Sequence, residues 1–282
     1  MATELRKRSR TLLRPYLFWL VVILAISVVV NHLRHDLTPG DVIDPLYGGV
    51  HATRPFSAFW FVTALFFAAL AYRAIERLPG IARWTVIGSG LLAGIVAGGV
   101  LSRIPLSIGT AWTCLAFIAA GAGFHALEPR LRTPLRTGVL SILGAAALIT
   151  AGWSAPLDIK QGDYGTPVLS VVVACALCGG LVLVAKWVFE HVPPGAHRTA
   201  TTLAKAGFVV ILCHAVVLML LNTGDIGGAE DFLLALLLPW ALGLLLLRTR
   251  MAPWAAGTEQ SGRTAQRPRT AGVAVAGRQG RM

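Results

Sequence analysis

Charged side chains are scarce in this sequence. Only 13% of its 282 residues are Asp, Glu, Lys or Arg, whereas 55% are hydrophobic. A soluble protein of this length needs a charged outer shell to stay dispersed, and here the charge is confined to short loops and the two ends. The composition therefore excludes an ordinary soluble domain and indicates that a lipid bilayer surrounds most of the chain.

Cysteine is also scarce. The four cysteines, Cys114, Cys175, Cys178 and Cys213, all lie in apolar segments, where cysteine behaves as a small apolar residue. A disulfide framework is thereby excluded. Cys175 and Cys178 form a C-x-x-C pair, but no second ligand pair accompanies them, so we predict no metal site.

Acidic residues are fewer than basic ones, 13 against 25, and the net charge is +12. Such an excess can indicate nucleic-acid binding. Here the basic residues lie where membrane topology requires them, so we expect anionic membrane lipids as partners and no nucleic acid.

Long apolar runs dominate what remains. A helix needs roughly 20 apolar residues to cross the hydrocarbon core. The sequence predicts an all-α, polytopic membrane helix bundle with about eight spans, at residues 15–33, 56–76, 82–102, 106–127, 137–154, 167–189, 203–222 and 231–249. The first run is too long for the apolar region of a cleaved signal peptide.

The loops between these spans alternate in charge. The N-terminus, the even loops and the tail are rich in Arg and Lys, whereas the first, fifth and seventh loops are acidic. By the positive-inside rule both termini face the cytoplasm. We therefore expect a multi-pass protein of the bacterial plasma membrane, with a basic segment at 1–14, a transmembrane domain at 15–250 and a disordered basic tail at 251–282.

The third span carries three glycines at four-residue spacing, Gly90, Gly94 and Gly98. This spacing puts them on one helix face and lets another backbone approach closely. The partner is either another helix of the same chain or, in a homodimer, a second copy.

His214 is the one ionisable residue deep within a predicted span. A neutral histidine can donate and accept hydrogen bonds and can act as a general base, so it is either a catalytic candidate or a structural residue bonded to a neighbouring helix. At the outer end of the first span, His32, His35 and Asp36 are read as a polar cap rather than a metal site.

Two further segments are candidates for substrate contact. Lys7, Arg8 and Arg10 could grip the phosphates of a nucleotide-bearing donor, or could serve only to fix topology. Trp60 and Phe61 lie in a dense aromatic run that either lines a substrate surface or packs against lipid and core.

Several segments together resemble the acyltransferase-3 family of integral membrane O-acyltransferases, most closely the branch of the fucose 4-O-acetylase type. The basic run RSRTLLRPYLFW at residues 8–19 resembles the family's segment ending in "LLxPYLFW". FWFVTALF at 59–66 resembles "WFLxALF", and 203–214, which ends on His214, resembles the late "LGKxSLxIYLLH" helix. A weaker match is LAFIAAG at 115–121.

The resemblance implies transfer of an acetyl or similar group from a cytosolic donor, acetyl-CoA or another acyl-CoA, to a hydroxyl of a glycan, lipid-linked sugar or metabolite. It implies no bound cofactor. It places the donor on Lys7, Arg8 and Arg10, substrate against Trp60 and Phe61, and the catalytic base at His214.

The sequence also departs from the family pattern. Family members usually have ten spans, and we expect the first two, with their histidine, to have no counterpart here. Lys7 replaces the first arginine of an Arg-x-x-Arg pair, and Gly207 replaces a serine. Two alternatives follow: a non-catalytic or truncated relative that acts as a scaffold or needs a partner, and, less favoured, a transporter.

Overall fold

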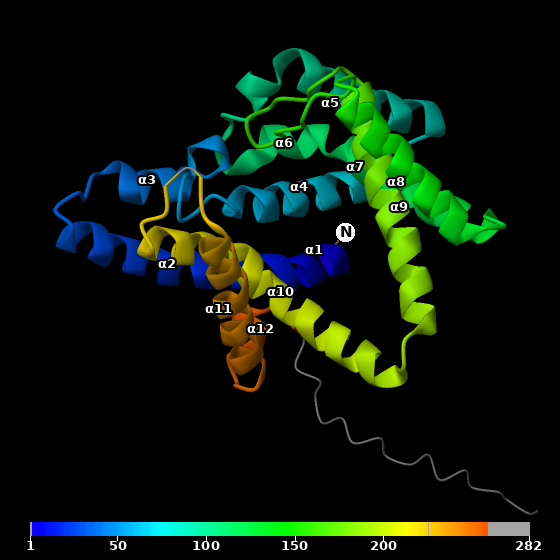
Figure 1. Ribbon diagram of the computed structural model, residues 1–282. Coiled ribbons are helices and arrows are strands. Elements are labelled where there is room, and N and C mark those ends of the chain that lie inside the picture. Colours follow the sequence, from blue (N-terminus) through cyan, green and yellow to red (C-terminus); the bar gives the residue numbers. More distant parts are fainter. Residues whose placement is uncertain (1, 225, 259–282) are drawn as a thin grey trace, which may run out of the picture.

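The computed structural model describes residues 2–224 and 226–258 (Figure 1). Within these ranges the chain is helical, with turns and 3₁₀ segments between the helices and no β-strand. The main helices are α1 (Ala2–Arg8), α2 (Arg14–Leu33), α3 (Gly40–Tyr47), α4 (Phe59–Ile75), α5 (Gly80–Leu101), α6 (Ile108–Thr113), α7 (Leu115–Leu127), α8 (Pro134–Thr150), α9 (Leu169–His191), α10 (Pro194–Leu220), α11 (Ala229–Leu247) and α12 (Ala252–Ala255).

Each of the eight apolar segments expected from the sequence is helical. Five described helices are long and apolar enough to cross a membrane: Leu5–Leu33, which joins α1 to α2 through a π-helical turn, and α5, α9, α10 and α11. A sixth candidate is the pair formed by α6 and α7, bent by 48°. The last two, α4 and α8, have 17 residues each, which at 1.5 Å per residue is about 26 Å.

Alternate loops meet on one side of the molecule. Tyr47 donates a hydrogen bond to the Arg103 carbonyl (3.1 Å), and Lys160 Nζ donates one to the Ala52 carbonyl (2.8 Å). Arg54 reaches the Thr223 carbonyl, so the first loop touches the third, fifth and seventh. We call the side formed by residues 34–58, 102–107, 151–168, 221–224 and 226–228 the acidic face.

Both ends of the described chain lie together on the opposite side, which we call the basic face. The Arg14 guanidinium lies 4.7 Å from the ring centroid of Trp254, and Lys186, in the last turns of α9, pairs with Glu128 of the fourth loop. The first contact joins the N-terminal segment to the segment after α11, and the second joins the end of α9 to the fourth loop.

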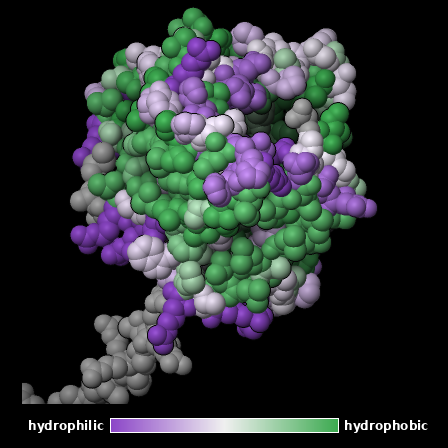
Figure 2. Space-filling view, turned by 90° about the vertical axis from the view of Figure 1, so that its left-hand side faces the viewer, coloured by the Kyte–Doolittle hydropathy of each residue, from purple (hydrophilic) through white to green (hydrophobic). Residues whose placement is uncertain are grey.

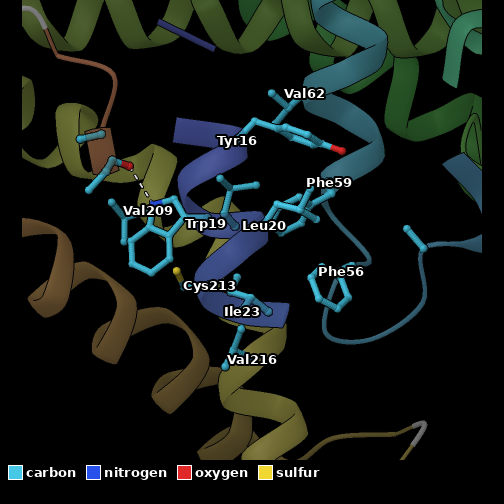
Figure 3. Packing of buried hydrophobic residues seen from close by; sticks show 14 of the residues in the cluster. Tyr16, Trp19, Leu20, Ile23, Phe56, Phe59, Val62, Val209, Cys213 and Val216 are labelled. Carbon is cyan, nitrogen blue, oxygen red and sulfur yellow. Dashed lines mark hydrogen bonds between the residues drawn. The ribbon is translucent and has the colours of Figure 1, made fainter. Parts of the chain in front are cut away.

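The largest core cluster surrounds α2. Because neighbouring helices cover α2 on two sides, its inward side chains are almost fully buried. Figure 3 shows these side chains from α2, α4 and α10 pointing toward one another: Tyr16, Trp19, Leu20, Ile23, Phe59, Val62, Val209, Cys213 and Val216. The packing fixes α10 relative to α4, and α10 and the segment before α4 both contribute to the pocket described below.

The segment after α11 returns to this core. Trp19 Nε1 donates a buried hydrogen bond to the Ala255 carbonyl (2.8 Å), and Ala255 is fully buried. The predicted tail from 251 thus begins with a short helix, α12, whose Ala255 belongs to the core cluster around α2. Residues 259–282 of that tail lie outside the described residues.

The three glycines of α5 are buried inside the chain. A Cβ on Gly90 would lie 2.6 Å from the Trp112 carbonyl oxygen, and one on Gly94 would lie 2.8 Å from the Tyr164 ring. On Gly98 it would lie 2.1 Å from the Gly162 carbonyl oxygen. This face is occupied by α6 and the fifth loop, which corresponds to the first of the two alternatives, close packing within one chain.

The remaining surface is strongly apolar. Figure 2 shows broad hydrophobic areas with hydrophilic residues gathered in separate patches instead of a continuous shell. Large apolar side chains are exposed along the long helices, including Val96 at 76% and Leu245 at 61%. An apolar surface of this extent is stable against lipid and would associate in water.

Gly98→Ala should destabilise the fold, because its Cβ meets backbone that cannot turn away. We expect a loss of about 1–3 kcal/mol, typical of overpacking. Gly99→Ala is the matched control, since that position has open space and alanine favours helix by up to about 1 kcal/mol. Thermal unfolding in detergent measures both, and equal midpoints for the two variants would contradict the packing.

Trp19→Phe should also lower the unfolding midpoint. Phenylalanine fills most of the space but leaves the buried Ala255 carbonyl without its donor, which costs about 1–3 kcal/mol. Trp153→Phe is the control, because Trp153 is 67% exposed. A midpoint unchanged by Trp19→Phe would show that α12 is not held by this hydrogen bond.

Candidate functional site

A pocket of about 320 Å³ opens on the acidic face between α10, α11 and the segment before α4. The walls are mostly apolar, and the ionisable lining residues are Arg54, His214 and Asp231. The other lining residues are Val210, Leu218, Thr223, Gly224, Gly227, Gly228, Phe232, Ala235 and Leu236. The pocket thus brings together three chain segments that are far apart in sequence.

His214 occupies the middle of the α10 wall and is partly buried. Its Nδ1 lies 2.9 Å from the Ile211 carbonyl oxygen and 3.2 Å from that of Val210. Carbonyl oxygens only accept hydrogen bonds, so Nδ1 carries the proton of the neutral ring. Nε2 is then the acceptor, which is the form a general base requires.

Arg54 stands at the mouth of the pocket. Its Nη1 donates to the Thr223 carbonyl, which ties the first loop to the end of α10. Lys160 supports the same loop from the other side through its hydrogen bond to the buried Ala52 carbonyl. Burial lowers the pKa of the Lys160 ammonium, and the Asp158 carboxylate opposes that shift.

Asp231 has a structural task at the start of α11. Its carboxylate accepts hydrogen bonds from Thr223 Oγ1 (3.0 Å) and from the Gly228 backbone N–H (2.9 Å). These bonds cap the helix and hold its start against the end of α10. With both oxygens occupied, Asp231 is a poorer candidate for proton transfer than His214.

The predicted aromatic pair does not reach this pocket. Trp60 is half-buried and Phe61 is 44% exposed, and neither belongs to the lining. Their neighbours Phe59 and Val62 point into the core instead. Because α4 is apolar around its whole circumference, hydropathy does not reveal which side faces inward.

The predicted donor segment lies away from the pocket, on the basic face. Lys7 and Arg10 are exposed and Arg8 is partly exposed. Arg10 lies in the π-helical turn Ser9–Leu13, which leads into α2. None of these three residues lines the pocket of His214.

Sequence reasoning missed Arg54. Its link to Thr223 joins residues 169 positions apart, which no local pattern reveals. One signal was present: Arg54 is a basic residue in a loop whose aspartates otherwise make it acidic. His32 and His35 are exposed and do not line the pocket.

Residues 3–250 match the model of the acyltransferase-3 family, which is described as an acyltransferase domain. The chain belongs to the acyltransferase-3 family. Searches of curated proteins and of solved structures found no match. Membership of this family and the long apolar helices together indicate a membrane acyltransferase.

The matched region of this acyltransferase-3 member contains every pocket residue. His214, which the late-helix resemblance singles out, lines the pocket, whereas Trp60 and Phe61 lie outside it and the basic segment lies on the other face. The fold therefore brings together His214 and Arg54 and separates His214 from the remaining predicted site residues.

The tautomer of His214 is directly measurable. In protein labelled with ¹⁵N-histidine, the His214 signal should show a protonated Nδ1 and an unprotonated Nε2 at neutral pH. The signal is identified by its loss in His214→Gln. A protonated Nε2 with an unprotonated Nδ1 would contradict the arrangement and remove His214 as a base facing the pocket.

Proposed function

We propose that this chain is an integral membrane O-acyltransferase that moves an acetyl or other acyl group from a cytosolic acyl-CoA to an acceptor hydroxyl. The acceptor class is a glycan, a lipid-linked sugar or a small metabolite. The observation that carries the proposal is His214, which lines a pocket within the family-matched region and whose Nδ1 lies 2.9 Å from the Ile211 carbonyl oxygen.

The eight helical segments would all cross the bilayer, with the basic face toward the cytosol. The positive-inside rule supports this orientation, because Arg and Lys gather at both termini and the even loops. The contacts that join alternate loops support the same topology. The protein would reside in the bacterial plasma membrane.

Lys7, Arg8 and Arg10 would bind the phosphates of the donor at the cytosolic face. Arginine and lysine at a membrane surface suit the several negative charges of a coenzyme A nucleotide. Because this segment does not line the pocket of His214, the extended pantetheine arm would have to enter the bundle to bring the thioester toward His214.

At the pocket, His214 Nε2 would accept the proton of the acceptor hydroxyl while the oxygen attacks the thioester carbonyl carbon. The new C–O bond forms, the C–S bond breaks, and the coenzyme A thiolate leaves. The proton then passes from Nε2 to the thiolate or to water, which restores the neutral histidine. General-base assistance of this kind typically contributes 10²- to 10⁴-fold.

One observation favours a second candidate, a scaffold that does not itself catalyse transfer. None of the basic donor residues lines the pocket of His214, so the described residues do not assemble the donor segment and the base in one pocket. In that case a partner would supply the missing chemistry.

The test uses cells without the gene, complemented by the natural chain or by variants. Mild alkali releases ester-linked acyl groups from envelope lipids and glycans, and mass spectrometry counts them. We expect the natural chain to restore acylation and His214→Gln to lower it about 100-fold or more. His125→Gln, an exposed histidine outside the pocket, is the matched control and should restore it.

Equal amounts of each variant in the membrane are verified by immunoblotting. Unchanged acylation in both the deletion and an overexpressing strain would refute the acyltransferase. Full restoration by His214→Gln would favour the scaffold or another base.

A further inference from the structure

The pocket on the acidic face is polar at its mouth and apolar at its floor. Arg54, Thr223 and the glycines at 224, 227 and 228 form the mouth. Val210, Ala235 and Leu236 lie deeper along α10 and α11. Such a gradient fits an amphipathic ligand and does not fit a wholly polar sugar.

His214 lies between these two zones. It is six residues before the end of α10, which at 1.5 Å per residue is about 9 Å below the mouth. Val210 is one turn deeper, by about 6 Å, and Leu218 is one turn nearer the mouth. A ligand group that meets His214 therefore lies between a head at the mouth and a chain on the floor.

Among the described lining residues, Arg54 is the one Arg or Lys. Its hydrogen bond to the Thr223 carbonyl uses one N–H of the guanidinium, and the group carries five such donors in a planar fork that matches phosphate geometry. The Asp231 carboxylate accepts two hydrogen bonds at the start of α11 and caps that helix. The three glycines leave the mouth without side chains that would block a bulky anion.

The pocket also opens sideways toward lipid. Phe232 lines it and is 64% exposed, and the adjacent Leu233 is 50% exposed. In a bilayer this opening faces acyl chains, so a lipid can enter without leaving the membrane.

We propose that the pocket binds a phosphate-bearing lipid, with the phosphate on Arg54, a hydroxyl at the level of His214 and the chain along Val210, Ala235 and Leu236. The inference rests on the proposed function, because it names the class of acceptor. The hydroxyl then lies between the phosphate and the chain, where Nε2 of His214 can take its proton.

The test measures binding to the purified full chain in a neutral detergent by native mass spectrometry, without any acyl donor. Lysophosphatidic acid carries phosphate, hydroxyl and chain, the monoacylglycerol of the same chain lacks the phosphate, and glycerol 3-phosphate lacks the chain. We expect lysophosphatidic acid to bind at least about tenfold more tightly than the monoacylglycerol, as one charge-assisted contact provides. We expect it to bind at least about tenfold more tightly than glycerol 3-phosphate, because that ligand buries no chain.

In Arg54→Gln the affinity for lysophosphatidic acid should fall to that for the monoacylglycerol. Arg54→Lys should keep a preference for lysophosphatidic acid over the monoacylglycerol of about threefold or more. Arg103→Gln, an exposed arginine on the same face, should change nothing. If Arg54→Gln does not fold, the comparison of the three ligands on the natural chain decides the question alone.

Equal binding of lysophosphatidic acid and the monoacylglycerol would overturn the phosphate site. Equal binding of glycerol 3-phosphate would overturn the lipid, because the anion would then come from free phosphate esters. Lipid binding without any acylation in cells would contradict the proposed function alone, and acylation of glycans without lipid binding would contradict this inference alone.

Discussion

The packing of α2 between α4 and α10 is the interaction on which the rest of the structure depends. Within lipid the hydrophobic effect provides no force between helices, so close van der Waals contact and a few hydrogen bonds must hold the bundle together. Trp19 provides both, because its ring fills the core and its N–H satisfies the Ala255 carbonyl. This packing sets α10, which carries His214, against the segment that leads from Arg54 into α4.

The two faces of the molecule divide the chemistry. Basic residues gather at the termini and the even loops, where a cytosolic nucleotide donor would bind, whereas the pocket of His214 and Arg54 opens on the acidic face. The loops of that face support one another, since Lys160 holds the loop of Arg54 and Arg54 holds the end of α10. A transferase built this way would join a donor and an acceptor that approach from different sides of the bilayer.

Much of this arrangement could be predicted from the sequence, because apolar length and loop charge act locally. The eight helical segments follow from the lengths of the apolar runs. The candidacy of His214 follows because it is an ionisable residue deep within one of them. Contacts between distant segments could not be predicted: Trp19 bonds to a residue 236 positions away, and Arg54 to one 169 positions away. The sequence also did not show which side of α4 faces inward. Phe59 and Val62 contribute to the core, whereas Trp60 and Phe61 do not.

Cysteine labelling in intact cells tests the two-faced site most directly. A membrane-impermeant maleimide is applied to chains that carry Leu218→Cys in the pocket wall or Lys7→Cys in the basic segment, with the unsubstituted chain as background. The account predicts labelling of Leu218→Cys in intact cells and of Lys7→Cys only after lysis. Labelling of Lys7→Cys in intact cells, with Leu218→Cys reached only after lysis, would contradict it.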